Sequence, residues 1–324
     1  MEQLTGLART LISTDQDKIK LDKAVKNTLA FKPLLARIFK VVISECAGLN
    51  YDEIEACIEG EVLISTVYVD GGLSNSGERI EGLSTETYFN GEGLDKYDLR
   101  TYLHLPGSKD HEYIKLLINI EAQNEDKPGY DIPLRALFYC CRMISAQQGI
   151  EFTTDADDPV KYGNIKKVYS IWICTDTAQK RANSIEQYSI DKKFLVGMNS
   201  DNPRYDILNA VIINISSKHD TEGTDSELIR LLTDLFNEDI NGIEKVKLLK
   251  NEYNLKLTKE VEAEVTDMCT YATAMENKGL EKGLKALIQS LKEYIKDFES
   301  LYQAVIKNED YASVSREDVM KYFN

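Results

Sequence analysis

The fold of this chain can be predicted from YDLRTYLHL at residues 97–105 and YIKLLINIEAQ at residues 113–123. Apolar residues alternate with other residues in both stretches, and this period of two is typical of β-strands. In the second stretch the alternation puts five residues on one apolar face: Ile114, Leu116, Ile118, Ile120 and Ala122. The segment between the stretches, LPGSKDHE, has the composition of a turn. The sequence therefore predicts an antiparallel β-hairpin.

The hairpin brings two carboxylates together if its turn centres between Lys109 and Asp110. Paired residues then have numbers that add up to 219, so Asp98 lies opposite Glu121. Directly opposed side chains share a face, with Cβ atoms about 4.5–5.5 Å apart. Gln123 lies two residues beyond Glu121 and shares that face. Two like charges this close repel each other, and a divalent metal is a common compensation. We therefore expect Mg²⁺, or Mn²⁺ in its place, at Asp98 and Glu121.

A metal held in this way suits the hydrolysis of phosphodiester bonds. It lowers the pKa of bound water and stabilises the charge that develops on a phosphate. The alternative is that Asp98 and Glu121 face solvent on an edge hairpin and pair with Arg100 or Lys115. The turn centre is an assumption, and a one-residue change of register would place the two side chains on opposite faces.

Helix and strand patterns on both sides of the hairpin predict an α/β fold. Helices are expected at residues 16–47, 51–59 and 131–148, the last with Pro133 in its first turn. Buried strands are expected at residues 167–175 and 208–215, whereas residues 70–96 have the composition of loops and turns with one short strand. From about residue 225 the pattern is helical to the end. We therefore expect a core domain at residues 1–220 and a helical region at residues 221–324.

Several segments resemble the PD-(D/E)xK nuclease superfamily, in its branch of transposase-like or recombination-promoting nucleases. The pattern of an aspartate, a hairpin and then Glu-x-Gln is the core of the resemblance. The wider likeness covers about residues 25–290 and is carried by IEGLSTET at 80–87, KYDLRTYLHLPG at 96–107, KLLINIEAQ at 115–123, PGYDIPLRALFYCCRMISAQQG at 128–149, KKVYSIWIC at 166–174 and NKGLEKGL at 277–284.

The resemblance implies a restriction-endonuclease-like mixed sheet, flanked by helices, that cuts DNA with a Mg²⁺-type metal. Matched residue by residue, Asp98 is the motif aspartate and Glu121 the second metal ligand. Gln123 stands where the superfamily usually has lysine. Glutamine can orient the attacking water by hydrogen bonds but adds no positive charge. Glu45, on the first long predicted helix, resembles a helix carboxylate that many such nucleases use for catalysis.

Basic residues beyond the hairpin are candidates for substrate binding. Arg135, Tyr139 and Arg142 share one face of the predicted helix at residues 131–148, and arginine is well suited to binding phosphate. The alternative is that Tyr139 lies in the core and the arginines pair with local carboxylates. Five further basic residues either steer a DNA backbone or form a solvated face: Lys161, Lys166, Lys167, Lys180 and Arg181.

The C-terminal region contains a heptad pattern at about residues 278–306. Apolar residues recur at alternating spacings of four and three, at Leu280, Leu284, Leu287, Leu291, Tyr294, Phe298, Leu301 and Val305. One interpretation is a coiled coil that joins two copies into a homodimer. The other is a helix packed on its own domain, and Tyr294 and Phe298 are poor residues for a tight two-stranded seam. Ser315 and Asp318 form the pattern of a capping pair that starts a last short helix.

Composition limits the remaining functions. The net charge of −15 argues against a general nucleic-acid binder, but 8 basic and 4 acidic side chains at residues 161–204 leave a local basic segment. Residues 41–160, with 8 basic and 23 acidic side chains, form an acidic segment suited to divalent cations. The six cysteines form no CxxC pair and the chain has three histidines, which disfavours a zinc site.

No signal-peptide layout and no apolar run of about 18 residues is found, so we expect a cytoplasmic protein without a membrane partner.

Three function hypotheses follow from these patterns. The first is a metal-dependent DNA endonuclease linked to recombination or mobile elements. The second is a catalytically weak nuclease-fold module that binds DNA or a protein, which the Gln123 departure and the net charge favour. The third is a scaffold assembled through the heptad region, for which Leu284 and Leu291 would matter and Asp98 would not. Metal dependence at Asp98 and Glu121 distinguishes the first from the other two.

Overall fold

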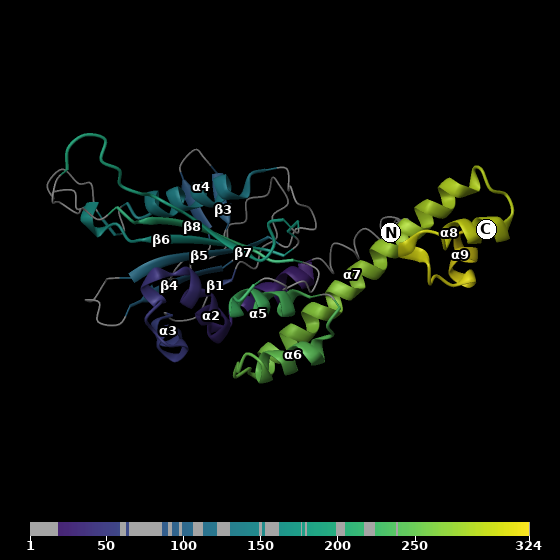
Figure 1. Cartoon of the computed structure of the whole chain (residues 1–324), viewed down its shortest axis with the longest axis horizontal. Coiled ribbons are helices and arrows are strands. Elements are labelled where there is room, and N and C mark those ends of the chain that lie inside the picture. Colours follow the sequence, from purple (N-terminus) through teal and green to yellow (C-terminus); the bar gives the residue numbers. More distant parts are fainter. Residues whose placement is uncertain are drawn as a thin grey trace, which may run out of the picture. The chain divides into compact units, whose positions relative to one another are not determined.

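The computed structural model describes residues 19–58, 63–64, 86–89, 93–96, 99–105, 113–121, 130–148, 151–152, 162–175, 177–178, 180–198, 205–216, 224–237 and 239–323. The chain forms two compact units (Figure 1). The larger unit is Lys23–Thr266 and contains the sheets, and the smaller consists of Met1–Asp22 and Asp267–Asn324.

A mixed sheet of six strands forms the centre of the larger unit, in the order β1-β4-β5-β6-β8-β7. In that order the strands are β1 (Leu63–Ile64), β4 (Leu99–His104), β5 (Tyr113–Glu121), β6 (Val168–Cys174), β8 (Leu208–Asn214) and β7 (Ser184–Ser189). β4 and β5 are antiparallel, β5, β6 and β8 are parallel, and β7 is antiparallel to β8. The predicted α/β class and hairpin are thus confirmed. A separate two-stranded sheet pairs β2 (Glu86–Phe89) with β3 (Gly93–Lys96), where one short strand was expected.

Helix α4 (Ile132–Ser145) covers one face of the sheet (Figure 1). Its first turn is stabilised by Asp131, whose side chain accepts a hydrogen bond from the backbone N–H of Leu134 at 3.0 Å. The helix buries its inner side against β6 and β8, and the Tyr139 ring stacks on Trp172 with centroids 5.8 Å apart. α4 therefore covers the apolar side chains of β6 and β8 on this face of the sheet, as parallel strands require.

The first predicted helix, at residues 16–47, is wrong as a single element. Residues 19–29 are helical, α2 is Lys32–Val42, a 3₁₀ turn η1 follows at Ser44–Cys46, and α3 is Tyr51–Cys57. Pro33 lies in the first turn of α2 and has no N–H to continue a helix from the preceding residues. Figure 1 shows α2 and α3 on the side of the sheet opposite α4, which makes the larger unit a three-layered one.

The boundary predicted near residue 220 differs from the compact units. α5 (Glu227–Phe236) and α6 (Gly242–Asn251) belong to the larger unit. Arg37 on α2 donates to Glu227 at 3.0 Å and to the backbone carbonyl of Tyr253 at 2.7 Å. The inner face of α5 buries Leu228, Leu232 and other leucines. The composition changes at about 220, but the packing continues across that point.

The heptad-patterned helix predicted at residues 278–306 is also interrupted. α7 (Lys259–Lys292) ends before Tyr294, α8 is Phe298–Val305, and a 3₁₀ turn η3 (Glu309–Tyr311) precedes α9 (Arg316–Phe323). In the smaller unit the seam residues pack against one another, since Leu284, Leu301 and Val305 share one buried cluster. This packing agrees with the interpretation of a helix packed on its own domain, and the homodimer stays a prediction.

The predicted Ser315–Asp318 capping pair is confirmed. The Ser315 hydroxyl accepts a hydrogen bond from the backbone N–H of Asp318 at 3.1 Å, and it donates to the Asp318 carboxylate at 2.6 Å. The cap stabilises the start of α9.

Candidate functional site

The register of the β4–β5 hairpin differs from the predicted one. Leu99 pairs with Ile118 and His104 with Tyr113, so the numbers of paired residues add up to 217. The predicted total of 219 is wrong by two. Because side chains alternate with a period of two, a shift of two residues keeps the predicted alternation of faces. It removes the direct opposition of Asp98 and Glu121, however, which required a total of 219.

The predicted metal ligands belong to one end of this hairpin in the chain. Leu99 is the first residue of β4 and Glu121 is the last residue of β5. Since the strands are antiparallel, the start of β4 and the end of β5 lie at the same end. Asp98 precedes Leu99 in the sequence, and both Asp98 and Gln123 lie outside the described residues. The structure therefore gives the backbone position of Glu121, and the metal site stays a prediction.

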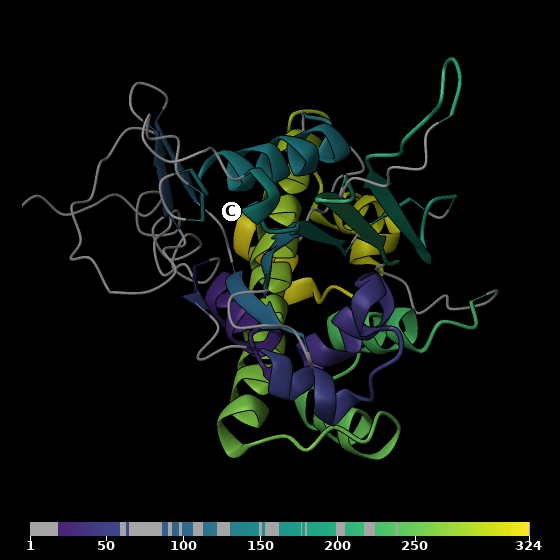
Figure 2. The ribbon, with the colours of Figure 1, turned by 90° about the vertical axis from the view of Figure 1, so that its left-hand side faces the viewer.

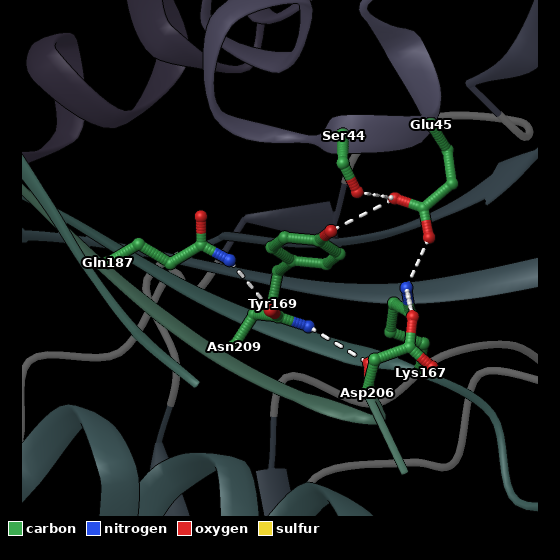
Figure 3. Close-up of polar contacts among 7 residues, drawn as sticks. All are labelled: Ser44, Glu45, Lys167, Tyr169, Gln187, Asp206 and Asn209. Atoms are coloured by element: carbon green, nitrogen blue, oxygen red, sulfur yellow. Dashed lines mark hydrogen bonds and ion pairs between the residues drawn. The ribbon is translucent and has the colours of Figure 1, made fainter. Parts of the chain in front are cut away.

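The fourth predicted catalytic residue, Glu45, is the centre of a polar network (Figure 3). One carboxylate oxygen, Oε1, accepts from Lys167 Nζ at 2.5 Å. The other, Oε2, accepts from Tyr169 Oη at 3.0 Å and from Ser44 Oγ at 2.9 Å. Lys167 Nζ also donates to Oδ2 of Asp206. One lysine thus joins two carboxylates that come from the 3₁₀ turn η1 and from the segment before β8.

The charged groups of this network stabilise one another in their ionised forms. Burial opposes ionisation of Glu45, but hydrogen bonds from Lys167 and Ser44 outweigh it and hold the pKa of Glu45 below its ordinary value. Burial likewise disfavours the charged form of Lys167, and hydrogen bonds to Asp206 and Glu45 outweigh it and raise the pKa of Lys167. Burial also raises the pKa of the Tyr169 hydroxyl. The network is therefore an ion pair with a neutral phenol at neutral pH.

Glu45 lies at the other end of the sheet from the backbone position of Glu121. Lys167 directly precedes Val168, the first residue of β6, whereas Glu121 pairs with Cys174, the last. The six steps from Val168 to Cys174 span about 20 Å. A glutamate bound to Lys167 cannot reach across that distance. The structure therefore does not bring Glu45 together with the predicted metal ligands.

Two residues of this network were missed or misassigned from the sequence. Lys167 was expected either to steer a DNA backbone or to lie on a solvated face, but it is 8% exposed and paired with Glu45 and Asp206. Asp206 was not singled out. Its neighbour Asn209 is buried, accepts from Gln187 Nε2 at 2.8 Å and donates to the backbone of Asp206 at 3.4 Å. A lysine and an asparagine at the starts of two apolar strands were the available signal, because buried polar groups need partners.

The two arginines predicted to share one face of α4 have different surroundings. Arg135 Nε donates to Tyr139 Oη at 3.1 Å, and its guanidinium lies over Tyr130 and near Trp172. Trp172 pairs with Asn119, two residues before Glu121, so Arg135 lies toward the predicted metal end. Arg142 is 8% exposed and lies against the Phe138 ring. Tyr139 is a core residue, as the alternative interpretation held.

The described side chains include no metal cluster. Within that part of the chain, no three His, Cys, Asp or Glu side chains are close enough to hold an ion. In the same residues, no helix has the length and apolar character needed to cross a membrane.

Comparisons with protein-family models, with curated proteins and with solved structures gave no match to this chain. The resemblance to PD-(D/E)xK nucleases therefore rests on the sequence segments. The described parts of those segments belong to a fold with a mixed sheet between helices, and Glu121 is the last residue of the hairpin strand β5.

Proposed function

We propose that this protein is a metal-dependent DNA endonuclease with a PD-(D/E)xK-type core. The observation that carries the proposal is the antiparallel β4–β5 pair, in which Leu99, the residue after Asp98, pairs with Ile118, three residues before β5 ends at Glu121. Under this proposal, a carboxylate directly before β4 and another at the end of β5 supply the one or two carboxylates that a Mg²⁺ site uses. A bound metal would activate water and stabilise negative charge on the scissile phosphate.

Each protein residue has a separate role in this proposal. Asp98 and Glu121 hold Mg²⁺ or Mn²⁺ through their carboxylate oxygens. Gln123 orients the attacking water by hydrogen bonding. Arg135 is the arginine of α4 nearest the predicted metal end, and we assign it to a phosphate of the DNA. Arg142 and Tyr139 support α4 from within the core.

We assign Glu45 to the scaffold rather than to the chemistry. Its carboxylate is neutralised by Lys167 and lies about 20 Å along β6 from the level of Glu121. It links the helical layer to the sheet and so fixes the start of β6. This replaces the role in catalysis that the family resemblance implied.

The second candidate function is a DNA- or protein-binding module without strong catalysis. Gln123 favours it, because glutamine supplies no positive charge to the attacking water. The two candidates share the fold and differ in whether a metal at Asp98 and Glu121 is needed.

Nicking and linearisation of supercoiled plasmid with Mg²⁺ or Mn²⁺ tests the proposal. Wild type is compared with Asp98→Ala and Glu121→Ala, and with Glu252→Ala as an exposed carboxylate control on the same unit. We expect cleavage that needs metal, is lost in the first two variants and persists in the control. Cleavage that survives both replacements would exclude this site. A folded wild type that binds plasmid without cutting it would favour the binding module.

A further inference from the structure

The segment after β7 exposes an unusual amount of apolar surface. Phe194 is 44% exposed, Leu195 85%, Val196 96% and Met198 87%. Gly197, between the last two, has a φ of 63°, a left-handed conformation that turns the chain at this point. Contiguous exposed apolar residues on a soluble domain usually mark a binding surface. We call residues 190–198 the β7 loop.

The β7 loop follows a strand that is paired along its whole length. Its preceding strand pairs with β8 along its whole length, from Ser184↔Asn214 to Ser189↔Asn209. Lys192 Nζ lies over the Phe194 ring, 4.8 Å from its centroid, and this cation–π contact orders the start of the apolar tip. The loop therefore presents its tip from a paired strand.

The segment of sequence that contains the β7 loop has a net charge opposite in sign to that of the whole chain. The chain carries a net charge of −15, whereas residues 161–204 carry 8 basic and 4 acidic side chains. Lys192 and Lys193 directly precede the apolar tip, whereas the exposed Lys180 and Arg181 precede β7 at its other end, which is level with Asn214. Such a segment attracts a polyanion that the rest of the surface repels.

A second exposed apolar surface lies on the same side of the sheet. Leu134 and Phe138 on the outer face of α4 are 64% and 52% exposed, and the Arg142 guanidinium lies 5.6 Å from the Phe138 ring centroid. Figures 1 and 2 both show the β7 loop rising on the side of the sheet that α4 covers. Exposed apolar side chains of α4 and of the β7 loop thus lie on one side of the sheet.

We propose that the β7 loop inserts its apolar tip between base pairs of a DNA duplex, with Lys192 and Lys193 on the flanking phosphates. Apolar wedges of this kind enter DNA between base steps and unstack them, and arginine or lysine residues hold the neighbouring backbone. The inference rests on the proposed function for the choice of DNA over other polyanions. It deepens that function, because duplexes that unstack easily become the preferred substrates.

The sheet fixes how far the wedge lies from the proposed cutting site. Glu121 is level with Cys174 and Asn214, and the β7 loop begins beyond Asn209 at the other end of β8. The strand between these levels spans about 17 Å. With the DNA axis along β8, at about 3.4 Å per base pair, the unstacked step lies about five base pairs from the cut phosphate.

The test uses the full-length protein in EDTA, so that binding is measured without cutting. The probe is a short duplex with 2-aminopurine opposite thymine at a flexible pyrimidine–purine step, whose fluorescence rises when the base unstacks. Anisotropy of a dye on the duplex end measures affinity in the same samples. We expect wild type to raise the fluorescence several-fold. The triple variant Leu195→Ser/Val196→Ser/Met198→Ser should abolish the rise and weaken binding by about tenfold.

Two controls separate the wedge from general effects. Ile243→Ser removes another exposed apolar side chain, on α6, and should leave both signals unchanged. Lys192→Ala/Lys193→Ala should lower the slope of log affinity against log salt by about 1.8, as expected for two phosphate contacts. All replaced side chains are on the surface, so unchanged thermal unfolding checks that each variant is folded.

Distinct results would overturn the wedge and the proposed function. Wild type that binds DNA without raising the fluorescence would overturn the wedge alone, even if it cuts plasmid. A fluorescence rise that the triple variant retains would do the same. Loss of self-association in the triple variant, measured by sedimentation, without a change in DNA binding would assign the loop to a second copy. Unstacking without metal-dependent cutting would keep the wedge and refute the nuclease.

Discussion

The Nζ atom of Lys167 lies 2.5 Å from Oε1 of Glu45, and the same nitrogen donates to the carboxylate of Asp206. Lys167 stands at the entry to β6, Glu45 in the 3₁₀ turn that follows α2, and Asp206 before β8. A single ammonium therefore joins the helical layer to the starts of two parallel strands. The side chains of Lys167 and Glu45 are 10% and 24% exposed, so this pair is shielded from most solvent screening.

Replacing Lys167 by methionine should destabilise the larger unit. Methionine keeps most of the volume of the lysine stem but leaves Glu45 as a shielded charge beside Asp206. We expect the free energy of unfolding to fall by about 1–3 kcal/mol, near the lower limit for buried pairs because Asp206 is more than half exposed. Urea unfolding followed by the fluorescence of Trp172, the only tryptophan, measures the loss. Lys180→Met, at an exposed position, is the control and should change little.

The same ion pair should make stability depend on acid pH. The pKa of Glu45 is lowered from 4.5 in the folded protein, so its contribution is fully present above that value and is lost as pH falls through the folded pKa. The stability difference between wild type and Glu45→Gln should therefore be constant from pH 6 to 8 and shrink below about 4.5. Lys167 has a raised pKa, so its contribution is lost only above about 10.5. A difference that is unchanged at pH 3.5 would contradict the pairing.

Strand identity could be predicted from the sequence because burial on both faces leaves long apolar runs. The predicted strands at 113–123, 167–175 and 208–215 agree with β5, β6 and β8 to within two residues at each end. β7, with the sequence SIEQYS, was missed because an edge strand whose residues are all at least partly exposed needs no such run. The register was wrong by two because turn composition does not fix the centre of a turn.

Long-range polar contacts could not be predicted from one sequence. Lys167 lies 122 positions from Glu45 and 39 from Asp206, and no spacing rule connects residues so distant.

The interruption of the predicted heptad-patterned helix could have been predicted, because the sequence contains a signal for it. Asp297 caps α8 by accepting from the backbone N–H of Ser300 at 2.9 Å. An aspartate directly before an apolar residue, here Phe298, is a signal for a new helix start, yet the apolar spacing continues across it.

Gly283 and Gly279 give a matched test of packing in the smaller unit. A Cβ on Gly283 would meet the hydroxyl oxygen of Tyr311 well inside van der Waals contact, whereas a Cβ on Gly279 meets nothing within 4 Å. Gly279→Ala should stabilise α7 by about 0.5–1 kcal/mol through its better helix propensity. Gly283→Ala should instead destabilise the unit by about 1–2 kcal/mol, because the ring must move.

The destabilisation expected for Gly283→Ala comes from contact with the Tyr311 hydroxyl, so removing that hydroxyl should restore stability. Without that oxygen the nearest ring atom to the new Cβ is 3.5 Å away, which is ordinary contact. The double variant Gly283→Ala/Tyr311→Phe is therefore expected to regain most of the loss, as measured by thermal unfolding of all four proteins. Additive effects of the two replacements would show that the clash does not determine the stability.

Replacing Gln123 by lysine tests why the chain departs from the usual motif. Under the proposed function, a lysine at this position adds a positive charge beside the attacking water and the scissile phosphate. We expect the rate of plasmid nicking with Mg²⁺ to rise by about 10- to 100-fold. Gln289→Lys, on an exposed position of α7, adds the same charge elsewhere and controls for a general gain in DNA affinity.

The rate must also depend on the metal ligands for this interpretation to hold. Adding Asp98→Ala to Gln123→Lys should return nicking to background, because the lysine assists water only at a bound metal. Equal gains in Gln123→Lys and Gln289→Lys would show that added charge acts through DNA affinity alone. No gain in Gln123→Lys, in a folded protein that binds DNA, would mean that glutamine is not the limiting feature. The binding module would then be favoured only if wild type also fails to cut.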